Sequence, residues 1–300
     1  MHSHNLFSNY NNGSSRVPFD CGVSFAEQLE RAYANKIQAL FITNHNTIEG
    51  YNQVIDYRDN HSKYRDIMIY PAEEITIDDG GHVLAYGISE EIKSAMTLED
   101  TLDKIKSQNG ISCAAHPFAV SNGIREKATL CDMIESFNSN NVDYFSNLMA
   151  FSFAKEHNLV TVAGSDSHIA STIGRCINFI EAENKLDDVI ESLKSGRTKI
   201  AKSEYITRKE LFEHAHYVIS NSKESILQYA LENYPYLHKT ANWALNSYIS
   251  NPNRKLWKLL GSFALYLTKR VSKKVNLKGH DPKVLQNRSW GTLIGISLIP

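Results

Sequence analysis

Residues 39–49 read ALFITNHNTIE, and this stretch shows the pattern on which the fold of the chain depends. The run Ala39–Thr43 predicts a short strand, and polar residues around His45 follow it directly. Comparable strand-like runs recur along the first 200 residues, at Ile67–Pro71, His82–Tyr86, Ile111–Ala115 and Thr161–Gly164. The first part of the chain is therefore expected to contain a sheet of short, apolar strands.

Helix candidates lie between these runs. Ser24 followed by Glu27 is a capping-box pattern, and Thr97 with Asp100 is a looser version of it. Further helices are predicted at Tyr51–Asn60, Val142–Glu156 and Leu186–Ser195. Because strands and helices alternate, the sequence predicts an α/β fold with a parallel sheet or an α/β barrel. In such folds, functional groups gather on the loops that leave the carboxyl ends of the strands.

Charge divides the chain into two parts. The formal net charge is −1, but residues 201–300 contain 15 Lys and Arg against 6 Asp and Glu, whereas residues 1–200 are acidic. After about Glu204 the strand signals fade, and helical spacing places five residues on one face: Trp257, Leu260, Ala264, Leu267 and Val271. We therefore predict a domain at 1–200 and a basic, mostly helical region at 201–300, whose apolar end WGTLIGISLIP (290–300) packs against the body.

The four cysteines are widely spaced and include no CxxC pair, which predicts reduced, buried thiols rather than a disulfide framework or a thiolate zinc site. They are Cys21, Cys113, Cys131 and Cys176. No pattern typical of a secretory leader opens the sequence. The longest apolar stretch of the tail, 256–267, contains Lys258 and is shorter than the roughly 20 residues of a spanning helix. These features predict a cytoplasmic protein without a transmembrane segment.

Histidines and carboxylates stand at the edges of the strand-like runs. His2 and His4 are two residues apart, as are Asp166 and His168, so on an extended chain each pair points to one side. The other candidates at such edges are His45, Glu73, Glu74, His82 and His116. Each feature alone is common by chance, but burying so many imidazoles and acids together is costly unless a cation compensates. Imidazole with carboxylate suits zinc, manganese or iron, so the set predicts a metal cluster.

An ordered set of motifs resembles the PHP (polymerase and histidinol phosphatase) superfamily over roughly residues 1–180. The motifs are HSHN (2–5), ITNHNT (42–47), PAEEIT (71–76), GHVLAYGI (81–88), AAHPF (114–118) and GSDSH (164–168). The resemblance implies an α/β fold, a distorted (β/α)7 barrel with a helical C-terminal extension. It also implies two or three divalent metal ions at the carboxyl ends of the strands. The implied ligands are His2, His4, His45, Glu74, His82, His116, Asp166 and His168. Glu74 is favoured over Glu73 because the glutamate of the family directly precedes an apolar residue.

The chain departs from the family pattern at two places. The family usually has an acid or a histidine a few residues after HxH, but here residues 5–15 read NLFSNYNNGSS. Asp20, in the later segment PFDCG, is the candidate for the missing metal ligand, reached by a longer loop. The family also tends to have Asp before the histidine of the second motif, where this chain has Asn44. Because an amide supplies no negative charge, Asn44 is predicted to hydrogen-bond to ligands rather than to bind metal.

The resemblance implies a metal-dependent phosphoesterase that hydrolyses phosphate esters by metal-activated hydroxide. Nucleotides, oligonucleotides and other small phosphomonoesters are the expected substrates. Cations lower the pKa of bound water to about 7, and two ions roughly 4 Å apart can hold both the attacking and the leaving oxygen. Glu74, as the bridging carboxylate, and with it His116 and Asp166 are the predicted catalytic residues. Arg125 and Arg175, on loops after AAHPF and GSDSH, are candidates for binding the phosphate of the substrate, with surface salt bridges as the alternative.

Several assignments stay open at this stage. Glu135 could touch a metal, orient a ligand or have a purely structural role. Six histidines have no convergent partner in the sequence and are interpreted as structural: His61, His157, His214, His216, His238 and His280. The cluster Lys269, Arg270, Lys273 and Lys274 is interpreted as a solvated helix face, with nucleic-acid backbone or an anionic membrane surface as alternative partners.

Two rival functions also remain. One is a non-catalytic PHP module that binds metal or a partner without turnover, and the other is a PHP-type protein-tyrosine phosphatase. The motif set with all its ligands argues against the first, whereas the missing acid after HxH and Asn44 argue for it. No feature of the sequence identifies a peptide groove.

Overall fold

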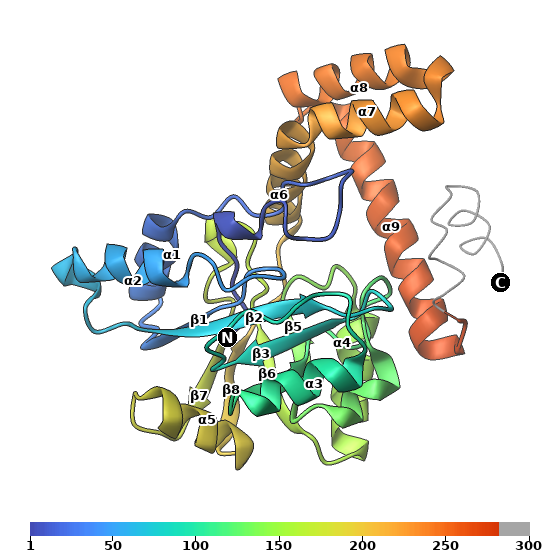
Figure 1. The fold of residues 1–300 in the computed structure, drawn as a ribbon. Coiled ribbons are helices and arrows are strands. Elements are labelled where there is room, and N and C mark those ends of the chain that lie inside the picture. The colour runs from blue at the N-terminus through green and yellow to red at the C-terminus, as the bar shows by residue number, and fades with distance from the viewer. Residues whose placement is uncertain (282–300) are drawn as a thin grey trace.

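The computed structural model describes residues 1–281, and its centre is a curled six-stranded sheet (Figure 1). The strands are β1 (Ala39–Ile42), β2 (Met68–Thr76), β3 (His82–Tyr86), β4 (Ile111–Ala114), β5 (Met133–Asn138) and β6 (Val160–Gly164). Their order in the sheet is their order in the chain. A two-stranded antiparallel sheet follows, made of β7 (Cys176–Ile180) and β8 (Thr198–Ser203). The predicted α/β class is confirmed.

The six-stranded sheet is mixed rather than parallel throughout. The pairs β1–β2, β4–β5 and β5–β6 are parallel, but β3 runs antiparallel to both of its neighbours. Only residues 77–81 connect β2 to β3. A parallel connection needs a crossover of a dozen or more residues, so this short link forces a hairpin. Of the two predicted alternatives, a parallel sheet or an α/β barrel, the parallel pairing is found everywhere in this sheet except at the two pairs that include β3.

The N-terminal segment links the two edges of the six-stranded sheet. The carbonyl of His2 accepts a hydrogen bond from the N–H of Asp166, just beyond β6 (2.9 Å). The carbonyl of Ser3 accepts one from the N–H of Thr43, next to β1 (3.0 Å). Ser3 and Ser167 form an isolated parallel bridge rather than a full strand pair. The closed (β/α)7 barrel therefore stays a prediction, although the segment stands where a seventh strand would close the ring.

Helices cover the outside of the sheet (Figure 1). They are α1 (Phe25–Ala34), α2 (Tyr51–Asp59), α3 (Leu98–Ser107), α4 (Tyr144–Glu156) and α5 (Leu186–Lys194). The capping box of Ser24 and Glu27 is present at the start of α1. Helix α4 begins two residues later than predicted, because the side chain of Asp143 accepts a hydrogen bond from the N–H of Ser146 and so caps the helix there (2.8 Å).

Two of the apolar clusters lie on opposite faces of the sheet. One packs Leu98 and Ile105 of α3 and Phe153 of α4 against β3, β4 and β5. The other lies on the opposite face, around Phe41 and Tyr86. Burying each side chain of this size contributes about 1.5–3 kcal/mol, which makes the sheet a firm support for the residues at its edge. All four cysteines are free and buried, as predicted.

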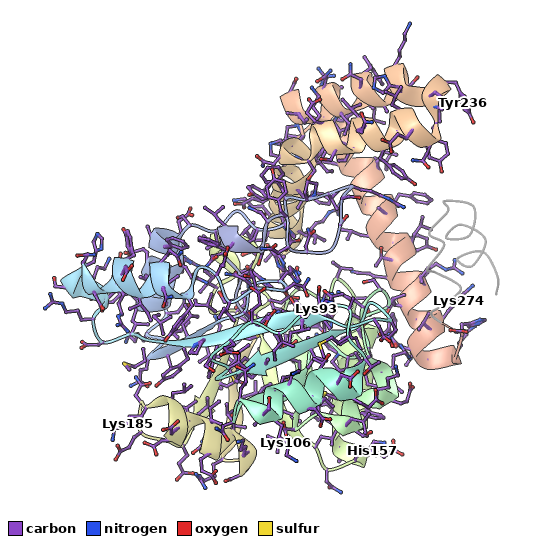
Figure 2. All side chains as sticks on the ribbon, viewed as in Figure 1. Lys93, Lys106, His157, Lys185, Tyr236 and Lys274 are labelled. Carbon is purple, nitrogen blue, oxygen red and sulfur yellow. The ribbon has the colours of Figure 1, made fainter. Side chains whose placement is uncertain are left out.

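Between β8 and residue 281, four α-helices follow: α6 (Arg208–Asn221), α7 (Lys223–Asn233), α8 (His238–Ser250) and α9 (Lys255–Lys278). Figure 1 shows α6 rising from the sheet, α7 and α8 side by side at the far end, and α9 running back. At that far end the side chain of Tyr236 projects outward, whereas Lys274 lies near the end of α9 (Figure 2). The predicted helix is confirmed in α9, but only part of its apolar face is buried: Leu267 and Val271 are covered, whereas Leu260 is 48% exposed.

The helical region meets the rest of the chain through α6 and α9, and Arg16 also stacks on Tyr229 of α7. The domain boundary near residue 200 remains a prediction, and WGTLIGISLIP (290–300) lies outside the described residues. Within residues 1–281, none of the helices combines the length and the apolar character needed to cross a bilayer.

Candidate metal centre

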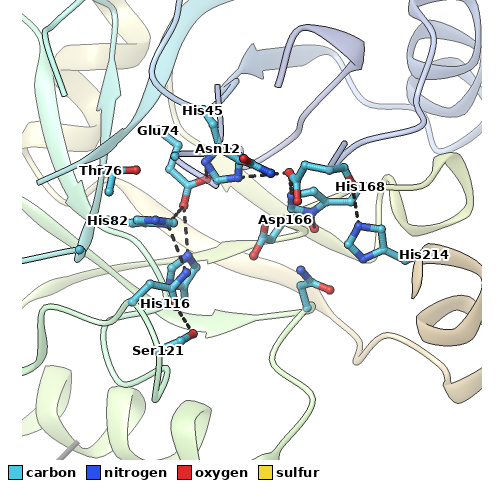
Figure 3. Close-up of a pocket in the computed structure, with 15 residues that line it drawn as sticks. Asn12, His45, Glu74, Thr76, His82, His116, Ser121, Asp166, His168 and His214 are labelled. Carbon is cyan, nitrogen blue, oxygen red and sulfur yellow. Dashed lines mark hydrogen bonds and ion pairs between the residues drawn. The ribbon is translucent and has the colours of Figure 1, made fainter. Parts of the chain in front are cut away.

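Six histidines and three acids meet at one end of the sheet, and they come from seven separate segments. They are His2 and His4 of the N-terminal segment, Asp20 of the loop before α1, His45 after β1, Glu74 in β2, His82 opening β3, His116 after β4, and Asp166 and His168 after β6. Most of these side chains are buried. Figure 3 shows His45, Glu74, His82 and His116 on one side of the pocket, and Asp166, His168 and His214 on the other.

The sheet topology explains this convergence. Strands β1, β4 and β6 present their carboxyl ends at one edge, as parallel neighbours do. His82 opens the antiparallel strand β3 opposite Thr76, which ends β2, so the start of β3 lies at that same edge. The hairpin that broke the parallel pattern is thus what brings His82 to the site.

Two of the site residues have unusual backbone conformations. His116 has φ 28° and Asp166 has φ 48°, both in the left-handed region that residues other than glycine rarely adopt. Such a conformation costs on the order of 1–3 kcal/mol and persists where the surrounding structure enforces it, commonly at functional sites. The chain turns sharply at these points, directly after β4 and β6.

The first group of side chains joins the N-terminal histidines to two acids. The Nε2 atoms of His2 and His4 lie 3.1 Å apart. Oε2 of Glu74 lies 3.3 Å from the first and 3.2 Å from the second. Oδ1 of Asp166 lies 3.5 and 3.4 Å from the same nitrogens. Two nitrogens and two carboxylate oxygens thus surround one point, as the ligands of a single cation do.

Glu74 lies at the centre of the whole cluster. Its Oε1 is 2.8 Å from Nδ1 of His82 and 3.1 Å from Nε2 of His116. Its Oε2 is 3.0 Å from Nδ1 of His45 and also faces the first group. Because the two oxygens face different imidazoles, this carboxylate connects the separate groups of histidines.

Asp20 forms the third group with two histidines. Its Oδ2 lies 2.8 Å from Nε2 of His168 and 3.3 Å from Nε2 of His45. His45 therefore faces Glu74 through one ring nitrogen and Asp20 through the other. The long loop after HSHN does bring an acid to the site.

Burial and charge oppose each other in setting the pKa values here. Burial raises the pKa of Glu74, but the nearby imidazoles, first those of His45 and His82, hold it well below its usual range. For Asp166, too, burial raises the pKa, and His2 together with other imidazoles more than reverses the effect. Both acids are therefore ionised at neutral pH, which is the form that binds cations.

Three histidines are held through Nδ1, which leaves Nε2 facing the cluster. Nδ1 of His2 lies 3.0 Å from Oε1 of Glu135, and Nδ1 of His168 lies 3.0 Å from the carbonyl of Asp166. Because a carboxylate oxygen and a carbonyl oxygen accept hydrogen bonds, we assign both Nδ1 atoms as donors. Nδ1 of His4 likewise lies 2.9 Å from the hydroxyl of Ser8. This arrangement directs the lone pair of each neutral ring at Nε2, as in metal-binding histidines.

Asn44 lies behind His4 in the same network. Its Oδ1 accepts hydrogen bonds from the hydroxyl of Ser8 (3.2 Å) and from the N–H of Asn5 (2.9 Å). Ser8 thus donates to Asn44 and can accept from Nδ1 of His4. The structure places Asn44 in the supporting, hydrogen-bonding position that was expected of it.

The donor set fits divalent cations. Oε2 of Glu74 and Oδ2 of Asp20 are buried, yet neither accepts a hydrogen bond from any of residues 1–281. A buried charged oxygen without a donor is costly, and a cation would remove that cost. The potential ligand groups with donor atoms within 4.8 Å of one another are His4–His45–His168, His2–His4–Glu74–Asp166 and His45–Glu74–His82. Nitrogen and carboxylate donors of this kind suit zinc, manganese or iron.

Glu135 supports two of the candidate ligands without facing the pocket. Besides the contact with His2, its Oε2 accepts a hydrogen bond from the N–H of His116 (2.9 Å). A Cβ atom on Gly164 would collide with this carboxylate, so the glycine of GSDSH leaves the space that Glu135 occupies. Of the roles left open for Glu135, the structure favours the orientation of ligands.

Replacing Glu135 by glutamine should lower the affinity for divalent cations by about 10- to 100-fold, the usual effect of losing an outer partner of a ligand. The glutamine side chain has nearly the shape of glutamate, but it lacks the carboxylate that orients the Nδ1 proton of His2. The measurement is a titration of metal-stripped protein with Mn²⁺. An affinity equal to that of the wild type would show that Glu135 only fills the interior.

The two arginines predicted to bind phosphate lie elsewhere. Arg175 donates from Nη2 to both carboxylate oxygens of Glu210, each at 2.8 Å, which ties it to α6. Arg125 stacks on the ring of Phe118 and donates to Oδ1 of Asn276 at 3.2 Å. Neither lines the pocket, so the geometry does not support a phosphate-binding role for them. Both lie on the predicted loops, but their charges are used to attach the C-terminal helices.

His214 was interpreted as structural, but the structure places it in the pocket wall. Its Nε2 donates to the carbonyl of Asp20 (2.7 Å), and its ring centroid lies 5.0 Å from that of His168. Burial lowers the pKa of His214 to about 4, with a further contribution from His168, so the ring is neutral. No sequence signal pointed to it, because α6 brings it from 194 positions away along the chain.

The pocket measures about 420 Å³. Apart from the candidate ligands, its wall is made mainly of neutral amides and hydroxyls: Asn12, Thr76, Ser121, Asn122 and Asn140. Among the described residues, neither lysine nor arginine lines it. Any negative charge on a bound molecule would therefore have to be neutralised by cations.

Comparison with known proteins finds similarity to a protein family, to curated proteins and to a solved structure. The family model described as PHP-associated matches residues 145–198. Two uncharacterised proteins of Methanocaldococcus jannaschii are each 28% identical to the chain, over 131 and 91 residues, which is 40% and 30% of this chain. The chain spans about half the length of these relatives, 55% and 50%. The crystal structure of PsfC from Pseudomonas syringae matches with a TM-score of 0.51 and 16% identity, over 74% of this chain and 96% of that one, a likeness of fold.

Proposed function

We propose that the chain is a metal-dependent phosphoesterase of the PHP superfamily that hydrolyses small phosphomonoesters, a proposal supported by the PHP-associated family model that matches residues 145–198. One observation above all supports this function. Glu74 contacts five imidazoles, its two oxygens face different groups of them, and Oε2 is buried without a hydrogen-bond donor among residues 1–281. Such an arrangement suits the binding of more than one divalent cation.

The chain offers ligands for two or three ions. His2, His4, Glu74 and Asp166 would hold one. Glu74, His82 and His116 would hold a second, and Asp20, His45 and His168 a third. When bound, such cations lower the pKa of water and neutralise phosphoryl oxygens, which is the chemistry that ester hydrolysis requires. The predicted essential roles of Glu74, His116 and Asp166 are then those of ligands that keep the cations in place.

The pocket wall favours a substrate with a single phosphate. A second phosphate or a polynucleotide backbone would call for cationic side chains, and none of the described lysines and arginines lines the pocket. Neutral amides and hydroxyls, such as those of Asn12, Asn122 and Thr76, are suited to hydroxyl groups on the rest of the substrate. We therefore favour small, hydroxyl-rich phosphomonoesters over the nucleotides and oligonucleotides suggested by the basic tail.

The basic cluster on α9 does not contradict this choice. Lys269, Arg270, Lys273 and Lys274 are not among the residues of the pocket wall. Lys269 borders a different hollow, between α6 and α9. Contact of this cluster with nucleic acid or a membrane surface remains a prediction that does not involve the pocket.

A substrate screen with added Mn²⁺ tests the function directly. Sugar phosphates, bisphosphonucleotides, phosphotyrosine peptides and short RNA or DNA are offered to the purified protein, and metal-stripped protein serves as the control. We expect phosphate release from sugar-phosphate-like monoesters and at least tenfold less from the bisphosphonucleotides. Release from phosphotyrosine alone would favour the protein-tyrosine phosphatase. Tight Mn²⁺ binding without turnover of any class would favour the non-catalytic module.

A further inference from the structure

The loop that brings Asp20 to the site is long and has little internal structure. Asp20 lies sixteen positions after His4, and beyond the short 3₁₀ turn Leu6–Ser8 no helix or strand occurs before α1. Ordering each residue of such a loop costs roughly 1–2 kcal/mol. A carboxylate that must stand within about 3 Å of His168 therefore needs strong external support.

Asn9 is the internal anchor of this loop. Its Oδ1 accepts hydrogen bonds from the N–H of Asp20 (2.7 Å) and of Cys21 (2.9 Å). Its Nδ2 donates to the carbonyl of Cys21 (3.0 Å), and also to the hydroxyl of Tyr217 on α6 (3.1 Å). The side chain that holds the backbone of Asp20 is thus itself fixed by the helical region.

Helix α6 also holds the loop at other points. His214 donates to the carbonyl of Asp20 at 2.7 Å, so both backbone groups of that residue are held. The hydroxyl of Ser222, just after α6, accepts from the N–H of Phe19 at 3.3 Å. The ring of Tyr217 packs so closely over Gly22 that a Cβ there would meet it at 2.9 Å.

A second contact of the helical region supports the opposite wall of the pocket. Nδ2 of Asn276 on α9 donates to the carbonyl of Phe118 (3.1 Å), and its Oδ1 accepts from Arg125 (3.2 Å). The loop between Phe118 and Arg125 contains Ser121 and Asn122, which line the pocket. The helices after β8 thus hold loops on two sides of one site.

We infer that helix α6 is a positioning element for the third cation site: His214 and Tyr217 hold the loop so that Asp20 meets His45 and His168. The inference deepens the proposed function and rests on it in one respect, that Asp20 binds a cation. It gives the C-terminal helices a role within the metal centre itself. His214 and Tyr217 act through Asp20 and are therefore positioning residues rather than catalytic ones.

Calorimetric titration of the metal-stripped full-length chain with Mn²⁺ tests this inference. His214→Ala should weaken one class of site by about 10- to 100-fold and leave the others unchanged, and Asp20→Asn should weaken that same class. The double variant should lose no more than Asp20→Asn alone, because both changes act on one site. His214→Gln, whose side-chain N–H can still donate to the carbonyl of Asp20, should largely restore binding.

Two further variants test whether a loss of Mn²⁺ binding in His214→Ala comes only from general damage to the structure. His216→Ala changes the same helix at a ring that packs against Tyr248 rather than against the loop, and it should bind Mn²⁺ as the wild type does. If His214→Ala fails to fold, as judged by circular dichroism, Tyr217→Phe replaces it. That change removes only one hydroxyl and should weaken the same class of site to a smaller extent.

The failures of the inference and of the proposed function can be told apart. A wild-type titration curve for His214→Ala, beside a site weakened in Asp20→Asn, overturns the inference and leaves the function standing. Unchanged binding in Asp20→Asn overturns it as well, because Asp20 would then hold no cation. A wild-type chain that binds no Mn²⁺ at all overturns both.

Discussion

Replacing Glu74 by glutamine should lower phosphomonoester hydrolysis by roughly a thousandfold or more. A cation contributes several kcal/mol of charge stabilisation in the transition state, and each 1.36 kcal/mol corresponds to a factor of ten in rate. Glutamine has nearly the shape of glutamate but no negative charge. It would therefore hold less tightly the cations proposed beside His2 and His4 on one side and beside His82 and His116 on the other. The rate is measured with saturating Mn²⁺, and bound metal per chain is counted in parallel.

The adjacent residue offers a matched control. Glu73 lies on the same strand, but it faces away from the cluster and accepts a hydrogen bond from the N–H of Ile92 at 2.9 Å. Burial raises its pKa to about 8, so it is mostly protonated at pH 7 and glutamine is a close substitute. Glu73→Gln should keep both activity and metal content. Equal activity in the two variants would refute the assignment of Glu74 as the bridging ligand.

Removing the metal should destabilise the protein markedly. A single ion present at 100 times its dissociation constant adds about 2.7 kcal/mol to the free energy of unfolding. For a chain of this size, that corresponds to a fall in Tm of roughly 4 °C when the ion is removed, and each further ion adds to the effect. Thermal unfolding of Mn²⁺-loaded and chelator-treated protein measures the difference.

The difference should widen as the pH rises from 6.5 to 9. Although burial lowers the pKa of His45, Glu74 and Asp20 raise it to about 10, and Asp20 and Asp166 raise the pKa of His168 to about 8 despite burial. In the stripped protein, the stability from these raised pKa values is complete below the unfolded value of 6.5. It is lost as the pH rises through the folded values. Metal binding instead strengthens as the imidazoles lose their protons. Equal Tm values with and without Mn²⁺ across this range would contradict the metal centre.

Local sequence patterns were sufficient to predict a helix, a strand or a pair of candidate ligands wherever the interaction that forms it spans only a few residues. The capping box of Ser24 and Glu27, the run Ala39–Thr43 and the spacing of HSH and DSH each depend on near neighbours in the chain. The direction of each strand in the sheet was harder to predict from the sequence. The hairpin between β2 and β3 followed from a connection of five residues, which is a matter of length rather than of residue type.

The long-range attachments show where sequence reasoning ends. Arg175 follows GSDSH closely and was a candidate for either phosphate contact or a salt bridge. The structure pairs it with Glu210, 35 positions later. His214 had no partner in the sequence, yet α6 places it against Asp20. Both outcomes depend on how α6 packs against the loops, and no periodicity or motif encodes that geometry.

The sequence by itself determined which residues could bind metal and in what order they occur, because motif spacing and strand periodicity are local properties of the chain. Only the tertiary structure decided how Asp20 reaches the site, which way Glu73 and Glu74 point in relation to the cluster, and that the C-terminal helices hold the pocket loops. Those features arise from contacts between residues far apart in the chain. Such contacts form only when the sheet curls and the helices pack. Their contribution to the free energy of folding therefore cannot be inferred from any single segment of the sequence.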